Sequence, residues 1–298
     1  MEEESIQKVS LECTVDTLCL SEIIPFLRLY NDKVVVVKIG GEIMQSPDIM
    51  PYLARDLIFM KQCNVHPVIV HGGGRQIDSM LSRLGIESRF EGGLRVTVQE
   101  AVEVVEMVLC GSLNRMVVQE INQHGGIAVG LSGKDGKMMY AEAYCNSAGG
   151  DLGHVGVPAS VNTSLVMHLV REGFIPVIAP IAADESGKTY NINADTAAGT
   201  IASHLGAARL LLMTSVNGVT DHEGRVYSSL SENEVEVLIA QNIITGGMIP
   251  KVQTALHALR EGVDGVAILN GLTKNALLLE LFTKYGTGTL IKGDVHGK

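Results

Sequence analysis

Two apolar runs, each followed at once by glycines, constrain the fold of this chain more than any other feature. Val34–Ile39 is a run of β-branched residues that only Lys38 interrupts, and Val65–Val70 is a second apolar run. Such runs are typical of strands buried on both faces of a parallel sheet. Parallel neighbours need a long crossover connection, which is usually a helix. The two runs therefore predict a strand–helix–strand unit.

The helices of this unit carry signals of their own. Ser46 as the N-cap, with Pro47 at the first helical position, predicts a helix that runs to about Gln62. A second helix is expected after the second strand, where apolar residues recur at helical spacing from Ile77 to Leu84. Each strand thus leads through a glycine-containing loop towards a helix.

The rest of the chain alternates between helical and extended patterns. A capping box at Thr97-Val98-Gln99-Glu100 predicts a long helix to about Gln123, and residues 127–143 are expected to form paired strands. A turn is expected at Asp184–Lys188. The other expected elements are helices at 21–30, 163–172, 195–206, 231–241, 250–261 and 274–284, and strands at 175–180, 209–214, 264–269 and 289–292.

This alternation predicts an α/β fold: a three-layer α/β/α sandwich with a mainly parallel central sheet. A soft boundary near Gly206 divides an N-terminal lobe (21–206) from a C-terminal lobe (207–298). Residues 1–20 show little pattern, and we expect them to form a disordered tail.

Composition excludes several classes of protein. The net charge of −10 argues against a nucleic-acid partner, because a nucleic-acid surface needs basic patches. Apolar runs stay well short of the ~20 residues of a membrane span, so no membrane association is expected. The five cysteines are scattered without CxxC spacing, which fits free thiols in a reducing cytoplasm rather than a zinc site or disulfide framework. The N-terminus begins with three glutamates and lacks the basic start of a signal peptide.

Lysines stand beside glycine clusters at two places, and a third glycine cluster lies between them. Lys38 precedes Gly40-Gly41, and Gly246-Gly247-Met248-Ile249-Pro250 precedes Lys251. Between them in sequence lies His71-Gly72-Gly73-Gly74. Glycines leave backbone N–H groups open to an anion, and lysines add positive charge. These clusters predict a site that holds and transfers phosphate groups.

One of these glycine clusters has other interpretations, and so does a further segment that imitates a phosphate loop. The His71–Gly74 loop could form the oxyanion hole of an esterase, but the chain has no G-x-S-x-G nucleophile elbow. It could also be a tight turn, although an anion site at the following helix fits better, with Arg75 nearby. Ser186-Gly187-Lys188-Thr189 imitates the end of a P-loop, but Ala182 stands where that motif needs glycine. A surface hairpin turn is the better interpretation.

Two polar segments could serve the same site. Asn191-Ile192-Asn193-Ala194-Asp195 places two amides and a carboxylate on one face if it is extended. Asp195 could cap the next helix or could orient the two lysines, and the presence of the lysines favours the second reading. Arg95 follows Gly92-Gly93-Leu94 and is suited to bidentate carboxylate binding, although a solvent-exposed arginine is also consistent with this segment.

Taken together, these segments resemble the amino acid kinase family, and within it the branch that phosphorylates N-acetyl-L-glutamate. The resemblance covers about residues 21–292. It is carried, in order, by V-K-I-G-G, I-V-H-G-G-G, G-G-L-R-V-T, Y-N-I-N-A-D-T and G-G-M-I-P-K. The last three are fairly specific to the acetylglutamate branch, and the first is shared across the family.

The resemblance implies a reaction and a set of roles. The ATP γ-phosphoryl group moves to the side-chain carboxylate of N-acetyl-L-glutamate with Mg²⁺, which is the second step of arginine biosynthesis. Lys38 and Lys251 stabilise the phosphoryl group in flight, Asp195 positions them, and no protein metal ligand is expected. The remaining implied positions are Gly40, Gly41 and Gly73 for phosphate, Gly73, Gly74, Arg95 and Asn191 for the acetylamino acid, and Thr214, Ser215, Gly218, Gly247 and Met248 for the nucleotide.

The resemblance also bears on assembly and regulation. The 21–30 segment looks like the extra N-terminal helix of a hexameric, arginine-inhibited subgroup. A homo-oligomer is therefore expected, either a hexamer built as a trimer of dimers or a dimer, with arginine as an effector. This chain departs from the family pattern at Ile43, Arg75, Ser215 and Asn275.

These departures bear on the substrate pocket, on ATP affinity and on arginine feedback. Two other readings stay open at this point. One is a related kinase that acts on another carboxylate or on a carbamate. The other is a non-catalytic arginine-binding regulatory subunit, which usually lacks the catalytic lysines that this chain retains.

Overall fold

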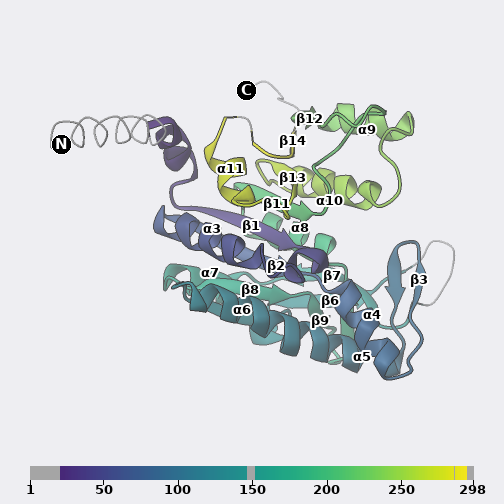
Figure 1. Ribbon diagram of the computed structural model, residues 1–298. Helices are drawn as coiled ribbons and strands as arrows, with labels where there is room; N and C mark the ends of the chain where they lie inside the picture. The colour runs from purple at the N-terminus through teal and green to yellow at the C-terminus, as the bar shows by residue number, and fades with distance from the viewer. Residues whose placement is uncertain (1–20, 146–151, 285, 294–298) are drawn as a thin grey trace, which may run out of the picture.

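Parallel strands form the centre of the computed structural model, which describes residues 21–145, 152–284 and 286–293 (Figure 1). Within these residues the main sheet has eight strands in the order β12-β14-β13-β11-β1-β2-β8-β5. All its neighbours run parallel except β13 and β14. The strands are β1 (Lys33–Ile39), β2 (Val65–His71), β5 (Ala128–Ser132), β8 (Ile175–Ala179), β11 (Arg209–Thr214), β12 (Ser229–Ser231), β13 (Val266–Asn270) and β14 (Thr289–Lys292).

Helices cover both faces of this sheet, so the predicted three-layer α/β/α architecture is confirmed (Figure 1). One face packs against α3 (Met50–Gln62), α4 (Gly74–Arg83), α5 (Gln99–Glu106), η1 (Met107–Leu113), α6 (Asn114–Gln123) and α11 (Ala276–Phe282). The other packs against α7 (Ser164–Arg171), α8 (Ala194–His204), α9 (Glu232–Ala240) and α10 (Met248–Arg260). Residues 21–30 are also helical, and there are two short helical turns, α2 (Gly41–Met44) and η2 (Asp135–Lys137).

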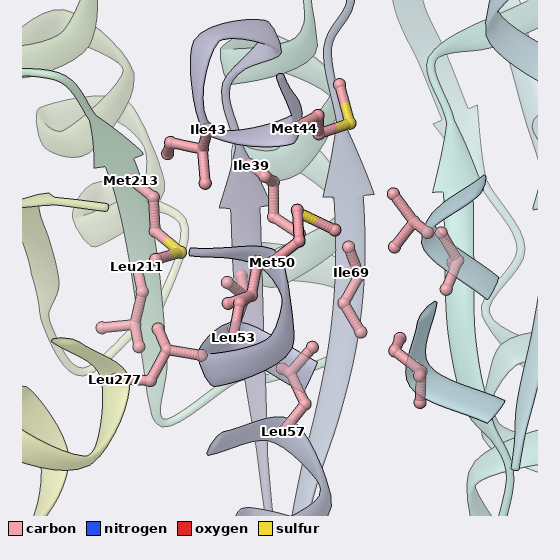
Figure 2. Close-up of a cluster of buried hydrophobic side chains, with 14 of the residues drawn as sticks. Ile39, Ile43, Met44, Met50, Leu53, Leu57, Ile69, Leu211, Met213 and Leu277 are labelled. Atoms are coloured by element: carbon pink, nitrogen blue, oxygen red, sulfur yellow. The ribbon is translucent and has the colours of Figure 1, made fainter. Parts of the chain in front are cut away.

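Alternation along the strands produces two separate cores. On β1, Val35, Val37 and Ile39 belong to the core on the α3 side, whereas Val34 and Val36 belong to the core on the α8 side. Figure 2 shows the first core, where Ile39, Leu53, Leu57 and Ile69 pack between the sheet and α3. Because side chains of a strand alternate between its faces, Lys38 lies on the α8 side.

Two smaller β elements stand beside the main sheet. Strands β6 (Met139–Ala143), β7 (Val155–Val161), β9 (Ile181–Ala183) and β10 (Thr189–Ile192) close on themselves in the order β10-β7-β6-β9. Strands β3 (Arg89–Glu91) and β4 (Leu94–Val96) form an antiparallel hairpin. Among the described helices, none combines the length and hydrophobicity that a bilayer span requires.

Three local predictions were wrong. The helix expected from Ser46 begins at Met50, because Pro51 occupies its first turn and residues 47–49 form a turn. Val98 rather than Thr97 is the N-cap of α5, and the Thr97 hydroxyl instead donates to the backbone oxygen of Arg95.

The strands within 127–143 do not pair with each other. β5 joins the main sheet beside β8, and β6 pairs with β7 and β9. Local sequence identifies strands here but not their partners, which are set by the tertiary packing.

Other predictions were confirmed. Residues 21–30 are helical, and the long helix from 99 to 123 is continuous, although its central turns at η1 are π-helical. Asp184 accepts hydrogen bonds from the backbone N–H groups of Ser186 and Lys188, as expected for the surface turn that imitates a P-loop. The disordered tail predicted for residues 1–20 lies outside the described residues.

Candidate active site

The glycine loops after β1 and β2 lie side by side at the carboxyl ends of the parallel strands, the usual place for ligands in such sheets. The N–H of Gly72 donates to the backbone oxygen of Ile39 at 2.9 Å. A Cβ on Gly41 would lie 2.8 Å from the Oε1 of Gln76 and 3.4 Å from the Cα of Gly73. A Cβ on Gly73 would overlap Leu113. A side chain at either glycine would therefore require Gln76, or Leu109 and Leu113, to move.

Lys38, Asp195 and Lys251 meet in space although they come from three elements. The Nζ of Lys38 lies 2.8 Å from Oδ1 of Asp195, an ion pair without a well-aligned hydrogen bond at that oxygen. The Nζ of Lys251 donates to Oδ2 of Asp195 at 3.0 Å. Lys38 and Asp195 are each only 8% exposed. A buried lysine needs such a partner, because a buried unpaired charge is strongly unfavourable.

The charge state of Asp195 follows from these contacts. Burial tends to raise the pKa of Asp195, but the two lysine ammonium groups outweigh this and hold the pKa below its ordinary value. The carboxylate is therefore ionised, with an ammonium group at each oxygen. It is placed to orient the lysines rather than to accept a proton.

The helix cap beside this carboxylate is Asn193. Its Oδ1 accepts hydrogen bonds from the N–H groups of Asp195 and Thr196, which begins α8. The side chain of Asp195 is thus not needed as a cap. Lys251 lies in the first turn of α10, where Pro250 is tolerated because that turn needs no N–H donor.

Two cavities adjoin the lysines. The first, of about 220 Å³, is lined by Lys38, Gly41, Gly73, Gly74, Arg95 and Asn191 among others. The second, of about 240 Å³, is lined by Lys38, Gly40, Glu42, Ile43, Met213, Thr214, Ser215 and Lys251. Lys38 lines both cavities. After the roles that the family resemblance implies, we call the first the acceptor cavity and the second the nucleotide-side cavity.

Arg95 is a buried part of the acceptor cavity, so it is not the solvent-exposed arginine that its sequence also allowed. Its guanidinium donates to both carboxylate oxygens of Asp78, to the Ser88 hydroxyl and to the backbone oxygen of Gly74. The ring of Phe90 lies 4.5 Å from the guanidinium carbon. These contacts fix the arginine before any ligand arrives.

Asn191 also lines the acceptor cavity. It comes from β10, and its Nδ2 donates to the Thr97 hydroxyl at 3.3 Å. A guanidinium and an amide therefore face a cavity that also has apolar walls, among them Leu94 and Val155. Such a lining suits a small amino acid derivative with a carboxylate and an apolar group.

The predicted nucleotide positions divide into two groups. Thr214 and Ser215 line the nucleotide-side cavity, at the end of β11. Gly218, Gly247 and Met248 are not among its lining residues. Gly218 has a φ of 138°, a backbone conformation that favours glycine. A Cβ on Gly218 would also lie 2.6 Å from the hydroxyl oxygen of Thr289. Backbone conformation and packing therefore explain the glycine at this position.

The departures from the family pattern lie in different places. Ile43 is buried in the first core and also lines the nucleotide-side cavity, and Figure 2 shows it beside Ile39 and Met213. Asn275 has a left-handed backbone, with φ at 56°, directly before α11.

No group of three or more potential metal ligands occurs among the described residues. Among the residues that line the nucleotide-side cavity, Glu42 carries the acidic side chain, and Thr214 and Ser215 offer hydroxyl oxygens. Mg²⁺ in kinase sites is held largely by substrate phosphates and water with one or two carboxylates. This donor set therefore fits a metal ion that arrives with a nucleotide.

Comparison with known proteins identifies the family. A sequence model of the amino acid kinase family matches residues 33–270. The chain belongs to the amino acid kinase family. Among curated members, an acetylglutamate kinase from Brucella abortus (strain S19) is 51% identical over 281 residues, which cover 91% of this chain and 95% of that protein. Another, from Brucella anthropi, is 50% identical over the same shares.

A solved structure agrees with this membership. N-acetylglutamate synthase from Neisseria gonorrhoeae, complexed with coenzyme A and N-acetyl-glutamate, matches with a TM-score of 0.83 at 25% identity. The match covers 93% of this chain but 63% of the synthase, so this amino acid kinase chain spans less than two thirds of that protein.

No role for the side chain of His71 was predicted from the sequence of this amino acid kinase. His71 is fully buried, and burial lowers its pKa to about 4, so the ring is neutral. Its Nδ1 lies 3.0 Å from the backbone oxygen of Gly72, and its Nε2 lies 3.2 Å from Nδ2 of Asn114. Asn114 also donates to the backbone oxygen of Val177 at 2.8 Å.

This network anchors the glycine loop to the start of α6 and to β8. A buried asparagine between apolar residues such as Leu113 and Val117 was the available signal for it. A second unpredicted contact joins the loops: Gln76 donates to the backbone oxygen of Gly41 at 3.0 Å.

Proposed function

We propose that this protein transfers the γ-phosphoryl group of ATP to the side-chain carboxylate of N-acetyl-L-glutamate. The observation that carries the proposal is the Lys38–Asp195–Lys251 cluster at the junction of the acceptor and nucleotide-side cavities. A phosphoryl group that passes from one cavity to the other meets both lysines. The curated relatives named acetylglutamate kinase support the choice of acceptor.

The chemistry fits the groups that are present. A carboxylate is already ionised at neutral pH, so the reaction needs no general base. One carboxylate oxygen forms a bond to the γ-phosphorus while the bond from that phosphorus to the bridging oxygen breaks, and its electron pair leaves with ADP. Catalysis therefore reduces to alignment and to neutralisation of charge on the phosphoryl oxygens.

Each residue has a proposed part in this step. Lys38 and Lys251 neutralise the phosphoryl oxygens, and Asp195 holds both lysines. The amides of Gly40, Gly41 and Gly73 bind phosphoryl oxygens at the loops that line the cavities. Mg²⁺, when bound with ATP, supplies further neutralisation of the phosphates, and Glu42 and Ser215 offer oxygen atoms on that side.

Arg95 and Asn191 hold the acetylamino acid, with Gly74 at the border of its cavity. Asp78, Ser88 and the Gly74 oxygen keep the guanidinium in place. An arginine that is already ordered loses little freedom when a carboxylate binds, which favours affinity.

The lobes divide the work in this proposal. The residues named for the acceptor cavity fall in 21–206, and Met213, Thr214, Ser215 and Lys251 bring the 207–298 lobe to the nucleotide-side cavity. We assign acetylamino acid binding to the first lobe. Nucleotide binding is assigned to the second.

A hydroxylamine trap tests the function directly. Purified protein is incubated with ATP, Mg²⁺ and N-acetyl-L-glutamate, and the acyl phosphate is captured as a hydroxamate. Parallel reactions use glutamate, aspartate, N-acetylaminoadipate and carbamate. Hydroxamate with N-acetyl-L-glutamate alone is the expected result. Faster product formation with another acceptor would overturn the assignment, as would an absence of product with every acceptor.

We also propose a homohexamer built as a trimer of dimers. The helical residues 21–30 expose Ile24 and Leu29, at 46% and 57%, and Met107 and Ile127 are each 62% exposed beside the edge strand β5. Exposed apolar side chains of this size suit subunit contacts. Sedimentation velocity should give a hexamer for the wild type and a dimer for Ile24→Glu/Leu29→Glu. A wild-type dimer would contradict the proposal.

L-Arginine is the proposed effector. A cavity of about 340 Å³ beside the 21–30 helix is lined by Tyr30, Arg209, Glu280 and Lys292, so both signs of charge are present for a zwitterion with a guanidinium group. Arginine titration of the phosphoryl-transfer rate, with Glu280→Gln as the variant, tests this. Full activity at saturating arginine, with no heat of binding, would exclude it.

A cytoplasmic location and a place in arginine biosynthesis complete the proposal. Cys63, Cys110 and Cys145 are free thiols in the structure, which suits a reducing compartment. Cell fractionation tests the location. Growth of the corresponding deletion strain with and without arginine tests the pathway.

A further inference from the structure

An ion pair joins the helical turns that begin at the two glycine loops. The Nη2 of Arg75, in the first turn of α4, donates to the Oε1 of Glu42 in α2. The neighbouring residue Gln76 ties the same two loops through the backbone oxygen of Gly41. Arg75 is one of the positions at which this chain departs from the sequence pattern of the family it resembles.

The acidic member of this pair borders the place proposed for the nucleotide phosphates. Glu42 lines the nucleotide-side cavity together with Lys38 and Lys251. A carboxylate at this position repels phosphate groups unless another charge compensates it. Arg75 supplies that charge from the opposite loop, and its side chain is 65% exposed and needs no burial to do so.

We propose that Arg75 is a positioning residue of the nucleotide site, which neutralises Glu42 and thereby lets the polyphosphate of the nucleotide approach the two lysines. The proposal rests on the function proposed above and adds to it a residue that touches neither substrate. Its effect falls on nucleotide affinity and not on the acetylamino acid, because Arg75 reaches the site through Glu42.

An ordinary exposed ion pair would behave differently. Such pairs contribute little to stability, and the loss of either member would have similar small consequences. Charge compensation instead predicts opposite effects for the two members. Loss of Arg75 leaves a carboxylate facing the phosphates, whereas loss of the Glu42 charge removes the repulsion itself.

The test is a titration of the protein with ADP by calorimetry, in EDTA so that no metal ion bridges Glu42 and the phosphates. Arg75→Ala should weaken ADP binding by about threefold to tenfold at low ionic strength. The difference from wild type should shrink as salt is added, because salt screens exposed charges. Glu42→Gln should bind at least as tightly as wild type, and Arg75→Ala/Glu42→Gln should return to within about twofold of it.

Two controls keep the result specific. Arg83→Ala removes an exposed arginine from the last turn of the same helix and should leave ADP affinity unchanged. Arg75→Pro, which fits the first helical turn, should weaken ADP binding as Arg75→Ala does, which separates charge from helix propensity.

Two outcomes would overturn the inference while leaving the function standing: equal ADP affinity in wild type and Arg75→Ala, or a double variant as weak as Arg75→Ala. Wild-type protein that binds ADP neither in EDTA nor in Mg²⁺ would overturn the inference and the proposed function together.

Discussion

The Oδ1 of Asn193 accepts a hydrogen bond from the backbone N–H of Asp195 at 2.9 Å. Asn193 therefore caps α8, and the side chain of the neighbouring Asp195 pairs with the lysines. This separation frees the Asp195 carboxylate to contact Lys38 and Lys251, one at each oxygen. A helix start thereby delivers a fixed carboxylate to the end of β1. These three side chains form the buried charge cluster between β1, α8 and α10.

Loss of either lysine should reduce turnover. By analogy with removal of one oxyanion donor, Lys38→Ala or Lys251→Ala should lower kcat by at least ~10²-fold. The reason is that the phosphoryl oxygens then lose a neutralising charge. Steady-state kinetics measure the effect, with Lys137→Ala, an exposed lysine in η2, as the control. Turnover near the wild-type value in either lysine variant would contradict the assigned roles.

Asp78 should act on substrate affinity through Arg95. The hydrogen bond from Arg95 lowers the pKa of Asp78, so the pair stays charged at neutral pH. Asp78→Asn should raise the KM for N-acetyl-L-glutamate roughly tenfold with a smaller effect on kcat, because the guanidinium loses its charged anchor. Ser88→Ala, which removes a neutral partner, should raise KM less. An unchanged KM in Asp78→Asn would show that Arg95 needs no anchor.

Asp56 should make stability depend on pH. It is buried on α3, its Oδ2 accepts the N–H of Leu277, and its Oδ1 has no hydrogen-bond partner among the described residues. Burial raises its pKa to about 7 from 3.8. At pH values between 3.8 and about 7, Asp56 binds fewer protons in the unfolded state than in the folded state. The free energy of unfolding therefore falls as pH rises through this range.

The size of this effect can be measured by difference. Asp56→Asn removes this titration. As pH rises from about 4 to above 7, the unfolding free energy of the variant should therefore rise relative to that of wild type by on the order of a few kcal/mol. Thermal melts of both proteins across this range measure it. Parallel pH profiles of Tm for the two proteins would refute the raised pKa.

Asn114 should matter for both stability and turnover. Asn114→Ala leaves His71 Nε2 and the Val177 oxygen without their donor, which should cost about 1–3 kcal/mol of unfolding free energy. kcat should fall as well, because His71 contacts the glycine loop at Gly72. Urea unfolding and kinetics check this, with Gln123→Ala on the exposed side of α6 as the control. If Asn114→Ala is destabilised but has the kcat of wild type, the network around Asn114 contributes to stability and not to turnover.

The sequence predicted the layers of the fold because they depend on periodicity. The run Val34–Ile39 could only be a strand buried on both faces, and it became β1 with a core on each side. Helix starts were harder to place. The chain has two possible starts for α3 a few residues apart, one at Ser46-Pro47 and the observed one at Ile49, with Pro51 in the first turn. Propensity alone does not decide between such neighbours.

The same limit applies to the site. Lys38, Asp195 and Lys251 could be identified because glycines and polar residues mark them in sequence. The pairing of Asp195 with both lysines was also expected, whereas the pairing of Arg95 with Asp78 depends on how separate elements pack. The buried contact between Asn114 and His71 is of the same kind, since it joins the start of α6 to the end of β2, far from it in sequence.

The most direct test of phosphoryl transfer across the lysine cluster uses N-acetyl-L-glutamate labelled with ¹⁸O in its side-chain carboxylate. The reaction with ATP and Mg²⁺ is followed by ³¹P NMR. Direct transfer predicts an acyl phosphate whose phosphorus resonance carries the isotope shift of one bonded ¹⁸O, and this signal should be lost in Lys38→Ala. Formation of inorganic phosphate with oxygen from water, and no labelled acyl phosphate, would contradict the account.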